Sequence, residues 1–260
     1  MLILLPSKSA ELLGDPNFPH LLDIEEQGAK ITRFQDLYQI YSRLGLTNPY
    51  DRPNAIGGLQ QRLLRTMDMQ GDFGIFESSE RKGWLPRSLL WRRGPDTHSL
   101  KRINFPPGYI SVPSWSWMAY TGEDAKGQDS VGGINYFKPT FDGFDWEELK
   151  SPWSGKGVDH PNVLKAKARQ FEWKRGEGAV IFDASTESDR YKGVCVVIGV
   201  QRGAVVSSEK VHYVIVVVPI GESNDTSGAS GGVGKKFKRV GAAYLYGKCI
   251  MGDAEDAEIY

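Results

Sequence analysis

The sequence has little cysteine and no excess of charge of either sign. Two cysteines in 260 residues are too few for the disulfide framework that stabilises many small secreted domains. Lys and Arg together number 32, as do Asp and Glu, so the formal net charge is zero. Proteins that bind nucleic acids or anionic membranes usually present a basic face, and the basic clusters here are short and scattered. We therefore expect neither nucleic acid nor a membrane as a partner.

Long apolar runs are also absent. The run Met1–Leu5 ends at Pro6 and follows no basic segment, whereas a signal peptide needs a longer apolar region behind a basic start. The run Val211–Ile220 contains His212 and is too short to cross a bilayer. Together these features predict a cytoplasmic protein.

Patterns for metal or phosphate binding are missing as well. The sequence has four histidines, and none lies near another or near a cysteine, so no zinc spacing exists. The glycine-rich segment before Phe237 resembles a phosphate-binding loop, but Ala229 stands where its first glycine belongs. Lys236 replaces the hydroxyl residue that holds magnesium in such loops. We expect no cofactor and no metal.

The amino-terminal part carries helical patterns. Thr32 and Gln35 fit a capping box, and apolar residues at helical spacing follow up to Gly45. Asp51 is suited to cap a second helix with Pro53 in its first turn. A third, short helix is predicted over residues 86–91.

From residue 110 the apolar period changes to two, which is typical of strands. Strands are predicted over 110–117, 134–137, 179–182, 194–200, 211–219 and 238–245, and a last strand is possible at the carboxy terminus. The fold class that follows is α+β, with amino-terminal helices packed on a mainly antiparallel carboxy-terminal sheet or sandwich. We expect a mainly helical region over residues 1–109 and a β-rich region over 110–260, packed as one unit.

The segment VPSWSWMAYTG, residues 112–122, places two of the seven tryptophans two positions apart. In a strand, Trp115 and Trp117 point to the same face, roughly 6.5–7 Å apart. On an exposed face they form a stacking platform for a sugar or a base, and on a buried face they add large apolar area to the core. The core interpretation is favoured because a helical segment is available to cover the sheet. Ser114 and Ser116 then take the opposite, wetter face.

Two sets of residues are candidates for hydrolytic chemistry. Asp145 and Glu148 lie in a cluster of acids that can supply a general acid and a general base. The same acids are also typical of an ordinary helix start, which is the favoured interpretation. Cys195 and His212 lie on neighbouring predicted strands and are conceivable as a nucleophile pair. A thiol inside an apolar strand is, however, usually inert.

Several segments resemble one protein family in their order along the chain. They are YSRLGLTNPYDRPNAIGGL (residues 41–59), GIFESSERKGWLPRSLLWRR (74–93), VPSWSWMAYTG (112–122), GGINYF (132–137) and, near the carboxy terminus, FKRVGAAYL (237–245). They resemble the region downstream of the conserved domain in fungal heterokaryon-incompatibility (HET) proteins. Segments typical of the HET domain itself, such as Ala-Leu-Ser-Tyr-x-Trp, are not found, so the chain looks like the half that follows this domain.

The resemblance implies a non-catalytic accessory or recognition module in nonself recognition, acting by contact with other proteins, its own HET-family relatives among them. The positions that match the family pattern, and that we expect to serve structural integrity or partner contact, are Ser42, Arg43, Asp51, Arg52, Trp91, Pro113, Trp115 and Trp117. Two alternatives stay open. One is a module that binds carbohydrate or another small ligand on an exposed tryptophan face, and the other is a hydrolase that uses the candidate residues named above.

Overall fold

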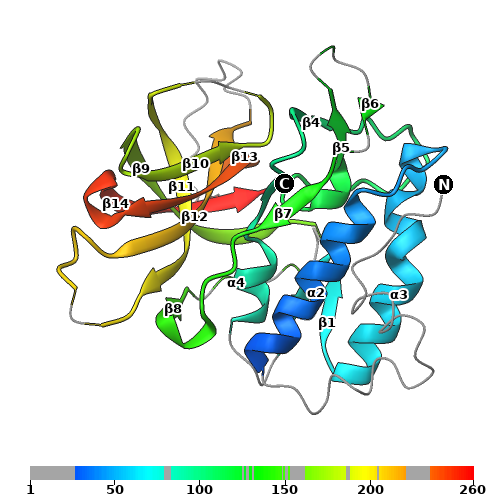
Figure 1. The fold of residues 1–260 in the computed structure, drawn as a ribbon, viewed down its shortest axis with the longest axis horizontal. Coiled ribbons are helices and arrows are strands. Elements are labelled where there is room, and N and C mark those ends of the chain that lie inside the picture. Colours follow the sequence, from blue (N-terminus) through cyan, green and yellow to red (C-terminus); the bar gives the residue numbers. More distant parts are fainter. Residues whose placement is uncertain are drawn as a thin grey trace, which may run out of the picture.

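The computed structural model shows helices on one side of the molecule and a large curled sheet on the other, with the carboxy terminus between them (Figure 1). It describes residues 27–78, 83–124, 126, 129–130, 132–147, 149, 152, 162–185, 188–203, 205–220 and 235–260. The predicted α+β class is confirmed, because the long helices come first and the long strands follow them.

The helices are α2 (Gln27–Ser42), α3 (Arg52–Met67) and α4 (Trp84–Ser88). α3 begins as predicted, after Asp51 at the N-cap position and with a proline in its first turn. The predicted capping box is wrong, because α2 begins before Thr32 and the Thr32 hydroxyl donates to the Gly28 carbonyl at 3.0 Å, one turn back. The predicted third helix is also shorter than expected, since Trp91 already belongs to a strand.

Short strands accompany the helices. The pairs are β1 (Gln70–Asp72) with β2 (Ile75–Glu77), β3 (Trp91–Arg93) with β7 (Ile134–Tyr136), and β5 (Tyr120–Glu123) with both β4 (Ser99–Arg102) and β6 (Asp129–Ser130). The part of the chain before residue 109 is therefore not purely helical. β3 and β7 place residues from distant parts of the sequence next to each other.

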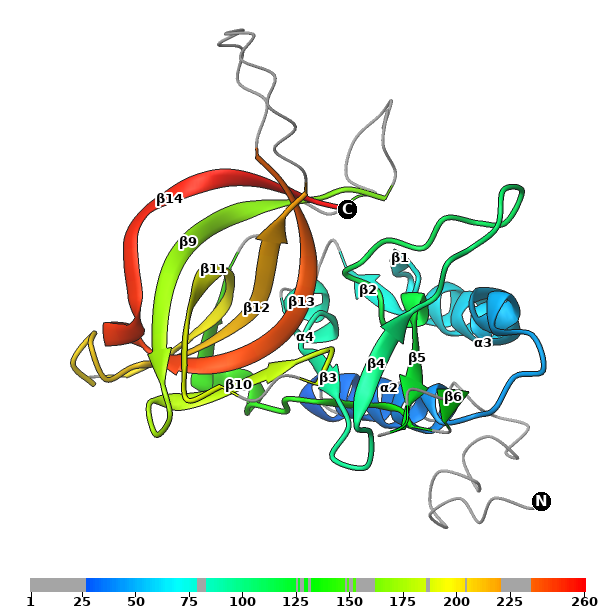
Figure 2. The same ribbon diagram turned by 90° about the horizontal axis from the view of Figure 1, so that it is seen from above.

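The large sheet has seven strands. They are β8 (Phe144–Trp146), β9 (Leu164–Lys174), β10 (Gly178–Phe182), β11 (Arg190–Gln201), β12 (Val211–Pro219), β13 (Lys235–Tyr246) and β14 (Ile250–Ile259). Their order is β10-β13-β12-β11-β9-β14, and β8 pairs with β11. β14 also pairs with β13 in parallel, so the sheet closes on itself (Figure 2). The remaining pairings are antiparallel, which confirms the mainly antiparallel sheet.

Around β11 and β12, both faces of this closed sheet are buried. Alternate residues of a strand point to opposite faces, and neighbours such as Cys195 and Val196 accordingly belong to different apolar clusters. Val196 and Ile215 share one cluster with Phe34 of α2 and with Trp117. The helical region and the sheet thus share a continuous core, which is where the tryptophan segment lies.

Candidate functional site

Residues 110–117 at the start of the tryptophan segment (residues 112–122) do not form a strand, so this part of the sequence prediction is wrong. Ser114 and Trp115 form a turn, and the Ser116 hydroxyl caps a short 3-10 helix, η3 (Trp117–Ala119), by accepting from the Met118 amide at 3.1 Å. Pro113 explains the turn, since its nitrogen cannot donate to a strand ladder and its carbonyl accepts from the Ser116 amide at 3.1 Å.

Both indole rings nevertheless lie in the core. Trp115 and Trp117 are each 1% exposed, which confirms their predicted burial. The two serines, Ser114 and Ser116, are equally buried, so the expectation that they face water is wrong. The Ser116 hydroxyl is satisfied internally, because it donates to the Phe73 carbonyl at 2.7 Å. A stacking platform would require exposed rings beside a groove, and this segment does not provide one.

Hydrogen bonds connect this segment to distant parts of the chain. The Trp91 indole nitrogen donates to the Trp115 carbonyl at 2.8 Å, and the Trp115 indole nitrogen donates to the Asn162 carbonyl at 3.0 Å. The Ser114 hydroxyl donates to the Tyr260 carbonyl and accepts from the Arg239 amide. The segment therefore joins β3 to β13 and to the end of the chain.

Arg239 lies at this junction with a fully buried side chain. Its guanidinium faces Asp183 with a nitrogen–oxygen distance of 3.3 Å, and it donates to the Leu89 carbonyl at 3.0 Å and to the Trp91 carbonyl. It also lies over the Trp91 ring, 3.3 Å from the ring centroid. Burial raises the pKa of Asp183, and the nearby positive charge of Arg239 opposes that rise. Each partner thus reduces the cost of burying the other.

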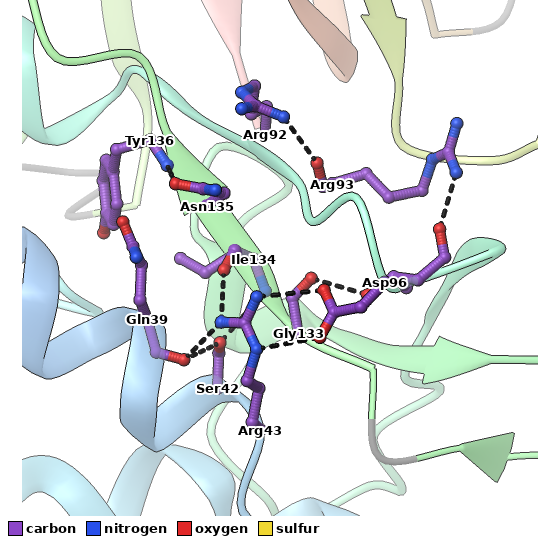
Figure 3. A network of polar contacts seen from close by, with 11 residues as sticks. Gln39, Ser42, Arg43, Arg92, Arg93, Asp96, Gly133, Ile134, Asn135 and Tyr136 are labelled. Atoms are coloured by element: carbon purple, nitrogen blue, oxygen red, sulfur yellow. Dashed lines mark hydrogen bonds and ion pairs between the residues drawn. The ribbon is translucent and has the colours of Figure 1, made fainter. Parts of the chain in front are cut away.

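Ser42 and Arg43 form a second junction, at the end of α2 (Figure 3). The Arg43 guanidinium donates to both carboxylate oxygens of Asp96, at 3.1 and 3.0 Å. It also donates to the carbonyls of Gln39 and Ile134, both at 2.8 Å. The Ser42 hydroxyl accepts from the Ile134 amide at 3.0 Å. The two side chains therefore tie α2 to β7 and to the turn at Asp96.

Arg52 extends this second junction to α3. Its guanidinium is buried and donates to the Ser42 carbonyl at 3.1 Å. Burial lowers the pKa of Arg52 to about 10.

The structure thus brings Ser42, Arg43 and Arg52 together, and it leaves Asp51 exposed at the start of α3. Trp91, Pro113 and Trp115 meet at the other junction, and Trp117 packs against Tyr38 of α2 with ring centroids 5.3 Å apart.

The candidate nucleophile pair is not assembled. Cys195 is paired with Val216 across the sheet, whereas His212 is paired with Val200. His212 and Val216 are four positions apart on β12, so the cysteine and the histidine are separated by roughly 13 Å along the strands. Burial raises the pKa of the Cys195 thiol to about 12, which removes the nucleophilic thiolate at neutral pH. Burial also lowers the pKa of His212.

Asp145 does not stand at a helix start, so that prediction is wrong for this residue. Asp145 lies in β8, after the 3-10 helix η4 (Phe141–Gly143), and its carboxylate pairs with Arg202 at 2.6 Å on the surface. Glu148 lies outside the described residues. Within the part of the chain that the structure describes, no group of three or more His, Cys, Asp or Glu side chains is placed to hold a metal ion.

Comparison with protein-family models, with curated proteins and with solved structures finds no match for this chain. Among the described residues, no helix has the length and apolar character needed to cross a membrane.

The buried ion pair gives a first testable expectation. Replacing Arg239 with Met should lower the free energy of unfolding by about 3–5 kcal/mol, because Asp183 is left as a buried charge without its partner. Urea denaturation measures this value. The matched control is Arg202→Met, which breaks the exposed pair with Asp145 and should cost at most about 1 kcal/mol. If both variants lost the same free energy of unfolding, the buried Arg239–Asp183 pair would not stabilise the fold more than an exposed pair does.

The thiols give a second expectation. At pH 8 a thiol with a pKa of about 12 is ionised in roughly one molecule in 10⁴, so Cys195 should not react with a thiol reagent in the native protein. A Cys249→Ser variant isolates Cys195, and absorbance of the released chromophore follows the reaction. Reaction should become complete in guanidinium. Rapid stoichiometric labelling of the folded variant would show that the thiol is accessible and ionised.

Proposed function

We propose that this chain is a non-catalytic recognition module of a heterokaryon-incompatibility-type protein and that it acts in the cytoplasm by contact with other proteins. The places that the eight residues matching the family pattern occupy in the fold support this proposal. Seven of the eight positions serve internal packing or hydrogen bonds, with Asp51 at a helix start. They build a scaffold and do not converge on an open cavity where a reaction would take place.

An exposed apolar loop around residues 105–110 supports the proposal that the chain contacts other proteins. Tyr109 and Ile110 are 45% and 54% exposed, so two adjacent large apolar side chains face the solvent on this loop. Tyr50 contacts the same loop, with its ring centroid 5.2 Å from that of Tyr109 and 6.1 Å from that of Phe105. Tyrosine-rich apolar surface is typical of the centre of protein interfaces. We name Tyr50, Phe105, Tyr109 and Ile110 the aromatic patch.

The scaffold holds the loop that carries this patch. At its base the Arg102 guanidinium donates to the Val112 carbonyl at 3.2 Å, and the Ile103 amide donates to the Ala119 carbonyl at 2.8 Å. Within the loop the Tyr109 amide donates to the Pro106 carbonyl at 3.1 Å. A loop fixed before binding loses less conformational entropy when a partner arrives. The tryptophan segment would thus contribute to recognition indirectly, by anchoring both ends of the loop.

The partner that we propose is another protein, a HET-domain relative in particular. The test co-expresses the chain with HET-domain proteins in a fungal host and scores growth arrest. We expect growth to change with at least one such protein, and the purified pair to bind. The double variant Tyr109→Ala, Ile110→Asp should bind more weakly, with a dissociation constant at least about tenfold higher. Aromatic anchors that become buried in an interface supply much of its binding energy.

The matched control is Val206→Asp, which alters another exposed apolar side chain, 66% exposed, in the region of the large sheet. It should bind like the wild type. Circular dichroism should show both variants folded. If the aromatic-patch variant binds and arrests growth as the wild type does, the patch is not the contact surface, and if no HET-domain protein has any effect, the family assignment fails.

A further inference from the structure

A small space lined by buried residues lies between α2, α4, β2 and β7, in the core of the helical region. Its volume is about 10 Å³, and its walls include the rings of Phe34 and Phe76 together with Gly74. A cavity needs roughly 10–15 Å³ of this kind of volume to hold one water molecule. The space therefore has the size of a single water and is too small for a larger ligand.

The walls are not purely apolar. Gln35, Tyr38, Trp84 and Tyr136 all line the cavity, and all are at most 4% exposed. Each carries one buried polar atom that has no hydrogen-bond partner among the described residues. These atoms are Gln35 Oε1, the Tyr38 hydroxyl, Trp84 Nε1 and the Tyr136 hydroxyl. Nearly all buried polar groups in proteins have a hydrogen-bond partner. Four unpaired polar atoms around one cavity therefore indicate that a hydrogen-bonding molecule lies inside it.

The chemistry of these groups matches the bonds that a water molecule makes. The indole nitrogen of Trp84 can only donate, Gln35 Oε1 can only accept, and a tyrosine hydroxyl can do either. Burial, and next the nearby Tyr136, raise the pKa of Tyr38, which agrees with two neutral hydroxyls close together. A water that accepts from Trp84 and one tyrosine, and donates to Gln35 and the other tyrosine, uses all four of its bonds.

We propose that this cavity is a binding site for one ordered water molecule, which links α2 through Gln35 and Tyr38 to Trp84 of α4 and Tyr136 of β7. Each orphaned polar group would otherwise destabilise the folded state, because it has lost its hydrogen bonds to water without gaining others. A cavity lined only by apolar groups would remain dry. The water is a structural element of the helical region, and the proposal does not depend on the family or on the partner of the chain.

A high-resolution crystal structure of the full chain tests this directly. We expect one isolated density peak in the cavity, about 3 Å from at least three of the four polar atoms. An empty cavity would overturn the proposal. So would side chains that rotate to bond one another and close the space.

Water–protein nuclear Overhauser spectra of the ¹⁵N-labelled protein give an independent readout in solution. The Trp84 indole proton should show a cross-peak to water. The indole proton of Trp91 is the internal control, because it is equally buried but already donates to the Trp115 carbonyl, and it should show none. A Tyr136→Phe variant removes one partner of the water, so the Trp84 cross-peak should weaken. Absence of the Trp84 cross-peak in the wild type, or equal cross-peaks from both indoles, would contradict a bound water.

Discussion

The buried guanidinium of Arg239 is the interaction on which the rest of the structure depends. Removing a charge from water costs several kcal/mol and is compensated only where opposite charge and hydrogen bonds surround it. For Arg239 these partners are the Asp183 carboxylate, the Leu89 and Trp91 carbonyls and the face of the Trp91 ring. They come from the end of β10 and from the α4–β3 segment, so the charge is stabilised only when the closed sheet and the helical region are docked. The docking of the two regions and the burial of Arg239 therefore require each other.

The residues that match the family pattern are, apart from Asp51, engaged in internal packing or hydrogen bonds at two junctions. Ser114 joins the Arg239 junction, since its hydroxyl accepts from the Arg239 amide, and Trp115 accepts from the Trp91 indole. At the other junction Arg43 and Arg52 satisfy carbonyl groups at the end of α2. Side chains occupied in this way are not free to bind a substrate. In the recognition role that we propose, the fixed interior holds the exposed loop, and the aromatic patch on that loop is the surface that would meet a partner.

Local patterns predicted much of this fold. The alternation and apolar character of VHYVIVVVP gave the bounds of β12 correctly, and Asp51 with Pro53 gave the start of α3. β9 was missed because LKAKARQFEWK mixes lysine and alanine in a pattern that is not typical of a buried strand. The burial of Trp115 and Trp117 followed from their size, but their turn and 3-10 conformation depends on Pro113 and on tertiary bonds. The partner of Arg239 lies 56 positions away, and no local spacing identifies it.

The central claim is that the helical region and the closed sheet form one cooperative unit through the Arg239 junction. Hydrogen exchange at increasing urea concentration, resolved by peptide, tests it most directly by comparing amides of α2 with amides of β12. A single cooperative unit loses protection everywhere at the same midpoint, and this is the result that we expect. If β12 stayed protected at urea concentrations where α2 already exchanges freely, the two regions would be independent and the account would be contradicted.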